Sequence, residues 1–202
     1  MALKYLELTA AQRRFYGQAQ EFSPGAGGER TALGADEIGF IAARDSFHLA
    51  TVSENGWPYV QHRGGPAGFL RVLDAHALAF ADLRGNRQLL STGNLAVPGH
   101  DRVALFPMAY SNRTRLKVMG HARVLDAREE PALAGQVAPD ASLRARIERI
   151  FVVSVISFDW NCPQHITPRY TREEIETAIA APLRARIAEL ESRLASAASS
   201  QP

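Results

Sequence analysis

The chain has 202 residues, of which 46% are hydrophobic and 22% are charged, and its formal net charge is +2. This composition is typical of a soluble globular protein with one core, and it excludes fibrous and intrinsically disordered classes. The small net charge gives no reason to expect a nucleic acid or an anionic membrane as partner. The sequence contains neither an apolar run of about 18 residues nor the apolar core of a secretory signal, so a cytoplasmic location is expected.

Several kinds of catalytic site find little support in the residues. The only cysteine is Cys162, so neither a disulfide nor a cysteine-based metal cluster can form within one chain. The six histidines lack the close spacing of a metal site, and no G-x-S-x-G elbow is present. The segment "GAGGER" follows no predicted strand and lacks the lysine of a phosphate-binding P-loop, so we interpret it as a linker.

Two helices are predicted near the N-terminus. Thr9 and Gln12 have the spacing of a capping box, which predicts a helix over residues 9–22. A second helix is predicted over residues 35–44, because acidic residues occupy its first turn and apolar residues recur at helical spacing. Its apolar face would consist of Ile38, Ile41 and Ala42.

The middle of the chain has the pattern of antiparallel strands. Residues 47–64 contain two β-rich runs joined by Asn55-Gly56, a pair that favours a type I′ hairpin turn. A second hairpin is predicted over residues 68–83, turning at Asp74 to His76, and a third over residues 101–127, turning near Ser111-Asn112. A last strand is predicted over residues 149–160. Six or seven short strands with regular turns indicate an antiparallel sheet that closes or nearly closes, and they exclude a doubly wound parallel sheet.

The C-terminal segment returns to helical spacing. Thr171 and Glu174 form a second capping box, and Pro182 is expected to kink or divide the helix. The helix carries an apolar stripe at Ile175, Ile179, Leu183, Ile187, Leu190 and Leu194. This stripe fits two alternatives, namely packing on the chain's own barrel or forming a seam against a partner subunit.

The first of three polar segments is "NRQLLSTGNL", residues 86–95. If a strand ends near Asp82 and a short helix begins near Asn86, Arg87 and Gln88 lie in its first turn. A helix N-terminus presents free N–H groups, and an arginine there is suited to phosphate. The alternative is a solvated arginine on a connecting helix. The later residues Gly93 and Asn94 are expected to end that helix.

Two other segments combine polar and aromatic residues. Gln61, His62 and Arg63 end a predicted strand before Gly64-Gly65, where a flat ligand or another backbone can approach. The segment after residue 159 offers stacking surface, amides and a cation in Trp160, Asn161, Gln164, His165 and Arg169. It has the character of a binding loop, although a rigid loop with Trp160 in the core is the alternative.

With these segments the chain resembles the pyridoxamine 5′-phosphate oxidase-like proteins, which are flavin mononucleotide (FMN)-binding split barrels. It is most similar to a subgroup with a "GNRQ…STGN" segment and a late "WNCPQHITPR" segment, and the resemblance covers roughly residues 36–171. It implies a mainly β fold, with a six-stranded antiparallel split barrel over residues 36–171 between N-terminal helices over 1–35 and a C-terminal helix and tail over 172–202. It also implies a homodimer with two FMN sites at the subunit interface.

The resemblance further implies a set of cofactor-binding residues. Arg87 and Gln88 match the family's phosphate-binding pair, with Asp82 contributing. Along the isoalloxazine ring lie His62, Arg63 and Gly64, and Arg115 aligns with a position that bonds the ring or the ribityl chain. Trp160, Gln164 and Arg169 resemble contacts supplied by the other subunit.

The expected activity is an FMN-dependent oxidoreductase of unknown substrate. Oxidation of vitamin B6 itself is not expected, because "QHRGGPAG" replaces the family's R-x-V-L-L-K run and "QHITPRYT" replaces its R-L-H-D-R type segment. His62 and His165 are candidates for proton transfer, since histidine titrates near neutral pH. The alternative is a protein that binds or senses flavin, haem or deazaflavin with little turnover. Neither a metal ion, a nucleic acid nor a membrane is expected as a partner.

Overall fold

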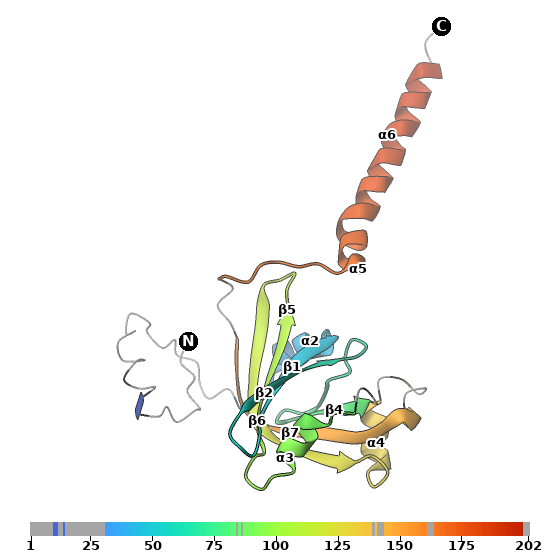
Figure 1. Ribbon diagram of the computed structural model, residues 1–202. Coiled ribbons are helices and arrows are strands. Elements are labelled where there is room, and N and C mark those ends of the chain that lie inside the picture. The colour runs from blue at the N-terminus through green and yellow to red at the C-terminus, as the bar shows by residue number, and fades with distance from the viewer. Residues whose placement is uncertain are drawn as a thin grey trace. The chain divides into compact units, whose positions relative to one another are not determined.

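The computed structural model describes residues 10, 11, 14, 31–83, 85, 87–138, 140, 144–160 and 164–199. The chain forms two compact units, one from Met1–Ala109 with Thr114–Pro163 and the other from Tyr110–Arg113 with Gln164–Pro202 (Figure 1). Of the predicted first helix, Ala10, Ala11 and Arg14 are helical, and the remainder lies outside the described residues. The division of the chain at residues 35 and 171 stays a prediction.

The first unit is built on one antiparallel sheet, which confirms the mainly β fold class. Its strand order is β2-β1-β5-β6-β7-β4-β3. Three hairpins contribute two strands each and β7 pairs with both β4 and β6, so the described sheet has seven strands and not the six that the resemblance implied. The strands are β1 (Ser46–Val52), β2 (Pro58–Gly64), β3 (Arg71–Asp74), β4 (Ala77–Leu83), β5 (Arg102–Ala109), β6 (Thr114–Asp126) and β7 (Ile147–Trp160).

The sheet curls around its core. Phe47 on β1 and Phe80 on β4 contact each other with ring centroids 5.1 Å apart, although β5, β6 and β7 lie between these strands in the sheet. Phe80 also stacks on Phe151 of β7 at 4.8 Å. Strand β1 alternates between buried and more exposed residues, as expected for a sheet with one face on the core. The curling therefore brings the two ends of the sheet toward each other.

The first hairpin was located correctly, but its predicted turn type is wrong. Strands β1 and β2 are joined by five residues, Ser53–Trp57, and among these only Gly56 has a positive φ, at 85°. The Gly56 amide donates to the Ser53 carbonyl at 2.8 Å, and the Ser53 amide donates to the Trp57 carbonyl at 2.9 Å. This is the pattern of a turn followed by a left-handed glycine, which does not need positive φ at Asn55.

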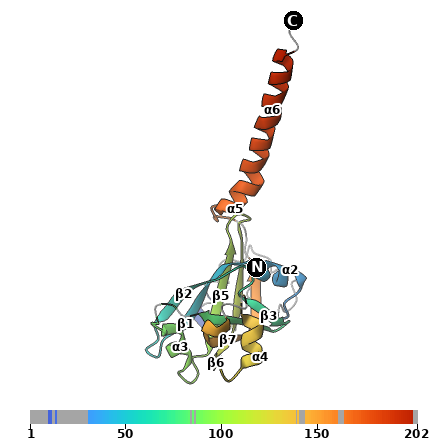
Figure 2. The ribbon, with the colours of Figure 1, turned by 90° about the vertical axis from the view of Figure 1, so that its right-hand side faces the viewer.

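Three helices and one short 3₁₀ turn flank the sheet in the described part of the first unit. They are α2 (Ala35–Ala42), α3 (Leu90–Leu95), α4 (Pro131–Val137) and the turn η1 (Arg144–Arg146). In both ribbon views α2 lies toward the opposite end of the sheet from α3 and α4 (Figures 1 and 2).

Helix α2 confirms the predicted position, but of the predicted apolar face only Ile41 is buried. Glu37 and Ile41 are its buried residues, whereas Ile38 and Ala42 are exposed. The Glu37 carboxylate accepts hydrogen bonds from the Gly34 amide at 2.9 Å and from the Trp160 indole at 2.6 Å. These two bonds explain why a carboxylate faces inward and the helix is rotated from the apolar pattern.

The second unit contains the C-terminal helices. They are α5 (Arg172–Ile175), the π-helical turn η2 (Glu176–Ala180) and α6 (Ala181–Ser199). The Thr171 capping box is confirmed, with the Glu174 amide donating to Thr171 Oγ1 at 3.1 Å and the Thr171 amide to Glu174 Oε2 at 2.7 Å. The predicted division near Pro182 takes the form of the π-turn just before it. None of the described helices is long and apolar enough to span a membrane.

Candidate functional site

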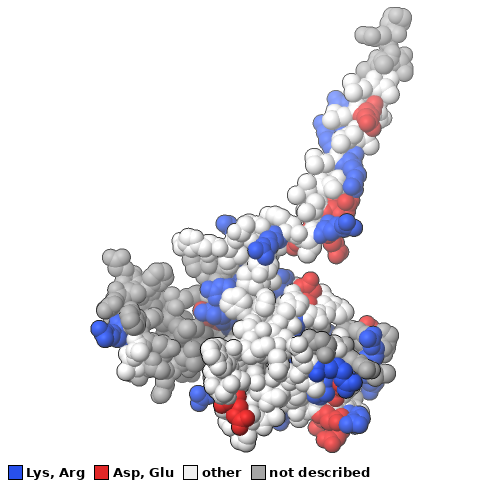
Figure 3. All heavy atoms as spheres, in the orientation of Figure 1, with Lys and Arg blue, Asp and Glu red and all other residues white. Residues whose placement is uncertain are grey.

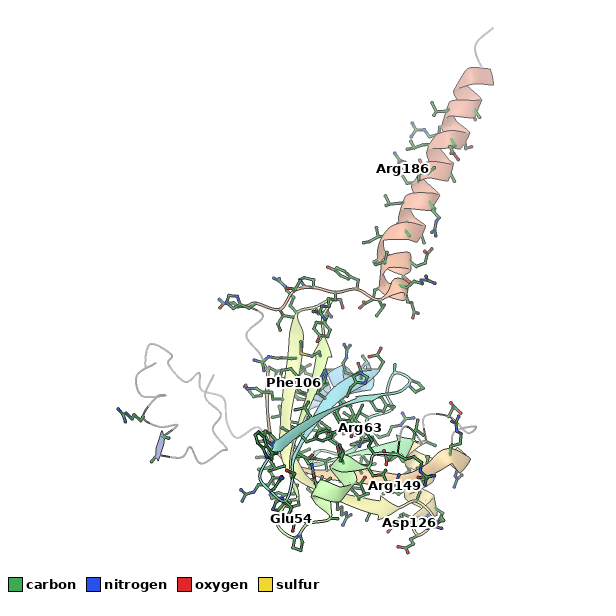
Figure 4. The ribbon with its side chains drawn as sticks, in the orientation of Figure 1. Glu54, Arg63, Phe106, Asp126, Arg149 and Arg186 are labelled. Carbon is green, nitrogen blue, oxygen red and sulfur yellow. The ribbon has the colours of Figure 1, made fainter. Side chains whose placement is uncertain are left out.

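The centre of the candidate site is the buried carboxylate of Asp82 at the end of β4. It accepts a hydrogen bond from Arg63 Nη1 on β2 at 2.6 Å and another from Arg149 Nε on β7 at 2.9 Å. Figure 4 shows Arg63 and Arg149 near each other within the first unit. Because β2 and β4 are not paired in the sheet, the Arg63–Asp82 ion pair links strands that the curled sheet brings together. One carboxylate therefore fixes two guanidinium groups at one place.

The electrostatics of this cluster favour the charged form of Arg149. Burial opposes the charge of Arg149, but hydrogen bonds and ionic attraction from Asp82 and Glu148 outweigh it and raise the pKa of the guanidinium. Arg149 Nη2 lies 3.0 Å from Glu148 Oε2. The guanidinium of Arg63 lies over the Phe151 ring at 4.9 Å, which adds a cation–π contact.

Arg87 reaches this cluster from a loop and not from a helix. It has a left-handed φ of 59°, and α3 begins only at Leu90, after Leu89, which also has a positive φ. The prediction that Arg87 and Gln88 lie in the first turn of a helix is therefore wrong, and Asn86 lies outside the described residues. Any anion site here depends on the Arg87 side chain and not on a helix N-terminus.

The predicted end of this helix is also wrong. Gly93 and Asn94 lie inside α3, which is six residues long. Ser91 Oγ donates to Gln61 Oε1 on β2 at 2.8 Å, and Asn94 Nδ2 donates to Thr51 Oγ1 on β1 at 2.8 Å. These tertiary bonds hold α3 against the strands, so the polar residues of "STGN" anchor the helix and do not stop it.

A small pocket of about 50 Å³ opens beside the Asp82 cluster. Three guanidinium groups, those of Arg63, Arg87 and Arg149, face two carboxylates in its wall. Arg63 Nε and Thr92 Oγ1 are buried, and neither has a hydrogen-bond partner within the part of the chain that the structure describes. A bound anion would accept hydrogen bonds from the unpaired donors and balance the excess positive charge. The full lining consists of Gln61, Arg63, Asp82, Leu83, Gly85, Arg87, Leu89, Thr92, Glu148 and Arg149.

A larger groove of about 740 Å³ shares four residues with this pocket, namely Arg87, Thr92, Glu148 and Arg149. Its volume lies in the range of sites for cofactor-sized ligands. At its rim Arg128 donates to Asp126, and these hydrogen bonds lower the pKa of Asp126 to about 2. Acidic and basic side chains gather side by side on this part of the surface (Figures 3 and 4). The groove therefore offers space for a larger body next to an anion pocket.

The structure brings some of the predicted cofactor residues together and separates others. Arg63, Asp82 and Arg87 line the same pocket. His62 lies on the opposite face of β2 from Arg63, because successive strand residues alternate, and its ring contacts His48 at 5.7 Å. Gly64 shares the more exposed face with His62, and Gln88 is exposed after Arg87 without lining the pocket.

Arg115 and Trp160 line neither the pocket nor the groove. The Arg115 guanidinium on β6 lies over the Phe106 ring at 5.2 Å. The Trp160 indole packs edge-on against Phe40 at 4.8 Å and donates to Glu37. Trp160 therefore packs as in the alternative given above, in which it belongs to the core and not to a binding loop.

Three further predicted residues, Gln164, His165 and Arg169, belong to the second unit. Arg169 lies over the Tyr110 ring at 5.0 Å, and His165 has a positive φ of 63°. Asn161 and Cys162 lie outside the described residues. The roles of Gln164, His165 and Arg169 at a flavin stay predictions.

Three polar pocket residues were not predicted as site residues from the sequence: Thr92, Glu148 and Arg149. Arg149 reaches the pocket because it pairs with Asp82 across the β4–β7 ladder. The sequence has a charged pair, Glu148-Arg149, at the start of a mostly apolar strand. That signal could have been used only if the pairing of β4 with β7 had been known.

Comparison with known proteins places the sequence in a family. The sequence model described as pyridoxamine 5′-phosphate oxidase matches residues 38–154. A search of curated proteins finds no match.

The solved structures to which this chain is similar share little sequence identity with it. HupZ from Group A Streptococcus is 11% identical, with coverage of 68% of this chain and 99% of that chain and a TM-score of 0.48. A pyridoxinephosphate oxidase family protein from Clostridium acetobutylicum is 13% identical, with coverage of 69% and 94% and a TM-score of 0.47. An FMN-binding protein from Syntrophomonas wolfei is 12% identical, with coverage of 61% and 81% and a TM-score of 0.45.

The family assignment rests on the sequence model, whose match spans more than half of the chain and includes most of the curled sheet with Arg63, Asp82, Arg87 and Arg149. The chain therefore belongs to the pyridoxamine 5′-phosphate oxidase family.

Proposed function

We propose that the chain binds FMN, with the phosphate in the pocket of Arg63, Arg87 and Arg149, and acts as an FMN-dependent oxidoreductase. The observation that carries the proposal is the excess of guanidinium groups around a pocket that also holds two unpaired donors, Arg63 Nε and Thr92 Oγ1. A phosphate carries close to two negative charges at neutral pH and accepts several hydrogen bonds. Its oxygens match the planar fork of an arginine.

The residues would divide the work of binding. Asp82 holds Arg63 and Arg149 in fixed positions, so these two cations are already oriented before a ligand arrives. Arg87 is more exposed and lies 4.0 Å from Glu148 Oε1, so it is the cation with the weakest internal pairing of the three. The adjoining groove would take part of the ligand beyond the phosphate.

A bound flavin supplies two-electron redox chemistry, and the chain's own residues would orient it and set its surroundings. We propose a homodimer, as the family resemblance implies, with His62 and His165 as candidates for proton transfer. The more exposed face of β2 that carries His62 would then be a face on which a second subunit can complete a site. The substrate is proposed to differ from vitamin B6, because the two segments that depart from the family pattern belong to its substrate shell.

A flavin-binding or sensing protein with little turnover is the second candidate. It is favoured by the lining of the anion pocket, whose described residues include arginines, carboxylates, an amide and a hydroxyl but no histidine. A haem or a deazaflavin would be alternative ligands of such a protein.

The visible spectrum of the purified protein tests the cofactor. We expect flavin absorbance near stoichiometric occupancy, or saturable binding of added FMN. A colourless protein with no affinity for FMN would overturn both candidates. Mixing the holoprotein with reduced nicotinamides and with pyridoxamine phosphate then separates them. Reduction of the bound flavin faster than free FMN supports the oxidoreductase, whereas no acceleration by any donor leaves the binding protein.

A further inference from the structure

The C-terminal helical segment exposes a row of large apolar side chains. Leu190 is 41% exposed and Leu194 is 71% exposed, and the other members lie between these values. The apolar stripe consists of Ile175, Ile179, Leu183, Ile187, Leu190 and Leu194. A continuous row of this kind on a surface helix marks an interaction site more often than scattered single residues do.

The π-turn keeps this stripe on one side of the helix. From Ile175 to Ile187 the apolar residues of the stripe recur every four residues, in three steps. On a regular helix of about 3.6 residues per turn, this spacing would move the stripe gradually around the helix. The π-turn η2 inserts about one extra residue, so the twelve residues from Ile175 to Ile187 make about three full turns and the stripe returns to the same side. Its bond runs from the Ala181 amide to the Glu176 carbonyl, just before Pro182, which has no N–H to donate. The local backbone thus aligns α5 with α6 along a single apolar face.

Beyond the π-turn the spacing is that of a two-stranded seam. Ile187 and Leu194 occupy a positions and Leu183 and Leu190 occupy d positions of a heptad. On the flanks, Arg186 and Arg193 fall at g positions, and Arg184 and Glu191 fall at e positions. The e and g residues decide the choice and direction of a partner helix.

These charges distinguish a parallel from an antiparallel pair of identical helices. In a parallel pair each g residue faces the following e residue of the other helix, so Arg186 meets Glu191 twice and no like charges meet. In an antiparallel pair g faces g, so Arg186 meets Arg193 and repels it twice, while Arg184 meets Glu191. The parallel arrangement has the better charge complementarity.

We propose that α6 pairs with α6 of a second copy of this chain as a parallel, in-register coiled coil. Glu191 has no ion pair within the described residues, so it is available to the second copy's arginine. Arg186 does pair with Glu189 at 2.5 Å, but both side chains are more than half exposed and such a pair stabilises little. Figure 4 labels Arg186 on α6, and charged groups of both signs flank uncharged surface along the helix (Figure 3).

A coiled coil of fewer than three heptads is marginal by itself. A homodimer of the first units, as proposed above, would raise the effective concentration of the two helices. The direction of pairing rests on the helix alone and does not depend on flavin binding.

Cysteine cross-linking in the full chain tests the pairing. In a Cys162→Ser background we introduce Leu190→Cys at a d position, and Ser192→Cys on the outer side as the matched control. Facing d residues can come within the Cα separation of about 4.4 to 6.8 Å that a disulfide requires. With a mild oxidant we expect covalent dimers from Leu190→Cys and few from Ser192→Cys. Equal yields, or no dimer from either variant, would overturn the proposal and favour a helix packed elsewhere.

Charge reversal tests the direction. In the Leu190→Cys background Arg186→Glu should slow cross-linking by roughly threefold or more, since two attractive pairs become repulsive. Adding Glu191→Arg should restore the rate. An antiparallel pair predicts the opposite, because Arg186→Glu would relieve its contact with Arg193, and faster cross-linking would therefore overturn the parallel assignment. FMN titration of the same variants separates the two proposals, since lost flavin binding with intact cross-linking counts only against the proposed function.

Discussion

At the scale of single residues, Arg87 is the proposed phosphate ligand that can be replaced with the least disturbance of the fold. Its side chain is about half exposed, and its Nη2 lies 4.0 Å from the Glu148 carboxylate. We expect Arg87→Ala to weaken FMN binding by about 1.5 to 3 kcal/mol, or roughly 10-fold to 150-fold in Kd. Fluorescence titration measures this, and riboflavin, which lacks the phosphate, should bind both proteins alike.

Arg128→Ala is the matched control for that experiment. Arg128 lies at the rim of the groove but already donates to Asp126 at 2.6 Å. It should therefore change FMN affinity little. An equal loss for FMN and riboflavin in Arg87→Ala would argue against the phosphate role of this residue.

Asp82 has a structural role that can be measured by unfolding. Its carboxylate is buried and carries ion pairs to Arg63 and Arg149, which are themselves mostly buried. Asp82→Asn removes the negative charge that balances the two buried guanidinium groups. We therefore expect the free energy of unfolding to fall by about 3 kcal/mol or more. Asp101→Asn, which breaks only an exposed contact with His121, should cost about 1 kcal/mol or less in the same denaturant titration. Similar losses in both variants would contradict this account.

The same residues show what could be predicted of the site from the sequence. The sequence identifies Arg63, Asp82 and Arg87 as candidate ligands, because they lie near the ends of predicted strands or in a polar loop. Thr92, Glu148 and Arg149 gain their place only from tertiary pairing, because Arg149 lies opposite Asp82 across two strands far apart in the chain. His62 was grouped with Arg63 by proximity in sequence, although strand alternation sends them to opposite faces.

At the scale of elements, the close approach of β6 and β7 depends on Gly120. A β-bulge falls between Met119 and Gly120, and a Cβ at Gly120 would meet the Ser154 carbonyl oxygen at 2.4 Å. We expect Gly120→Ala to destabilise the protein by about 1 to 3 kcal/mol, because backbone atoms must move. Gly93 lies inside α3, where an added Cβ meets nothing, so Gly93→Ala should be neutral or stabilising by up to about 1 kcal/mol. Thermal unfolding of the two variants measures the contrast, and equal destabilisation would refute the steric explanation.

Element positions were easier to predict than element boundaries. The three hairpins and the last strand follow from runs rich in β-branched and aromatic residues that are bounded by turn residues. The turn at Asn55-Gly56 and the start of α3 depend instead on single backbone angles and on hydrogen bonds such as that from Ser91 to Gln61. Such bonds join residues distant in sequence, so local patterns do not contain them.

At the scale of the whole molecule, the two compact units allow flavin binding and helix pairing to be tested separately. The anion pocket and groove belong entirely to the first unit, whereas α6 belongs to the second. A ligand that binds only the native state stabilises it by about 2.7 kcal/mol at a concentration of 100 times Kd. For a chain of this size, that corresponds to a rise in Tm of roughly 5 to 11 °C.

We therefore expect FMN to raise the Tm of the first unit by this amount, and riboflavin at the same concentration to raise it less, because only FMN places a phosphate among the arginines. Arg87→Ala should lower the FMN shift, whereas Arg186→Glu on α6 should leave it unchanged. The measurement is thermal unfolding followed by the near-ultraviolet signal of the aromatic core. A shift that is equal for FMN and riboflavin would show that the ligand is held without its phosphate. A shift lost in Arg186→Glu would instead show that flavin binding requires the C-terminal helix, because that residue lies outside the unit that contains the pocket.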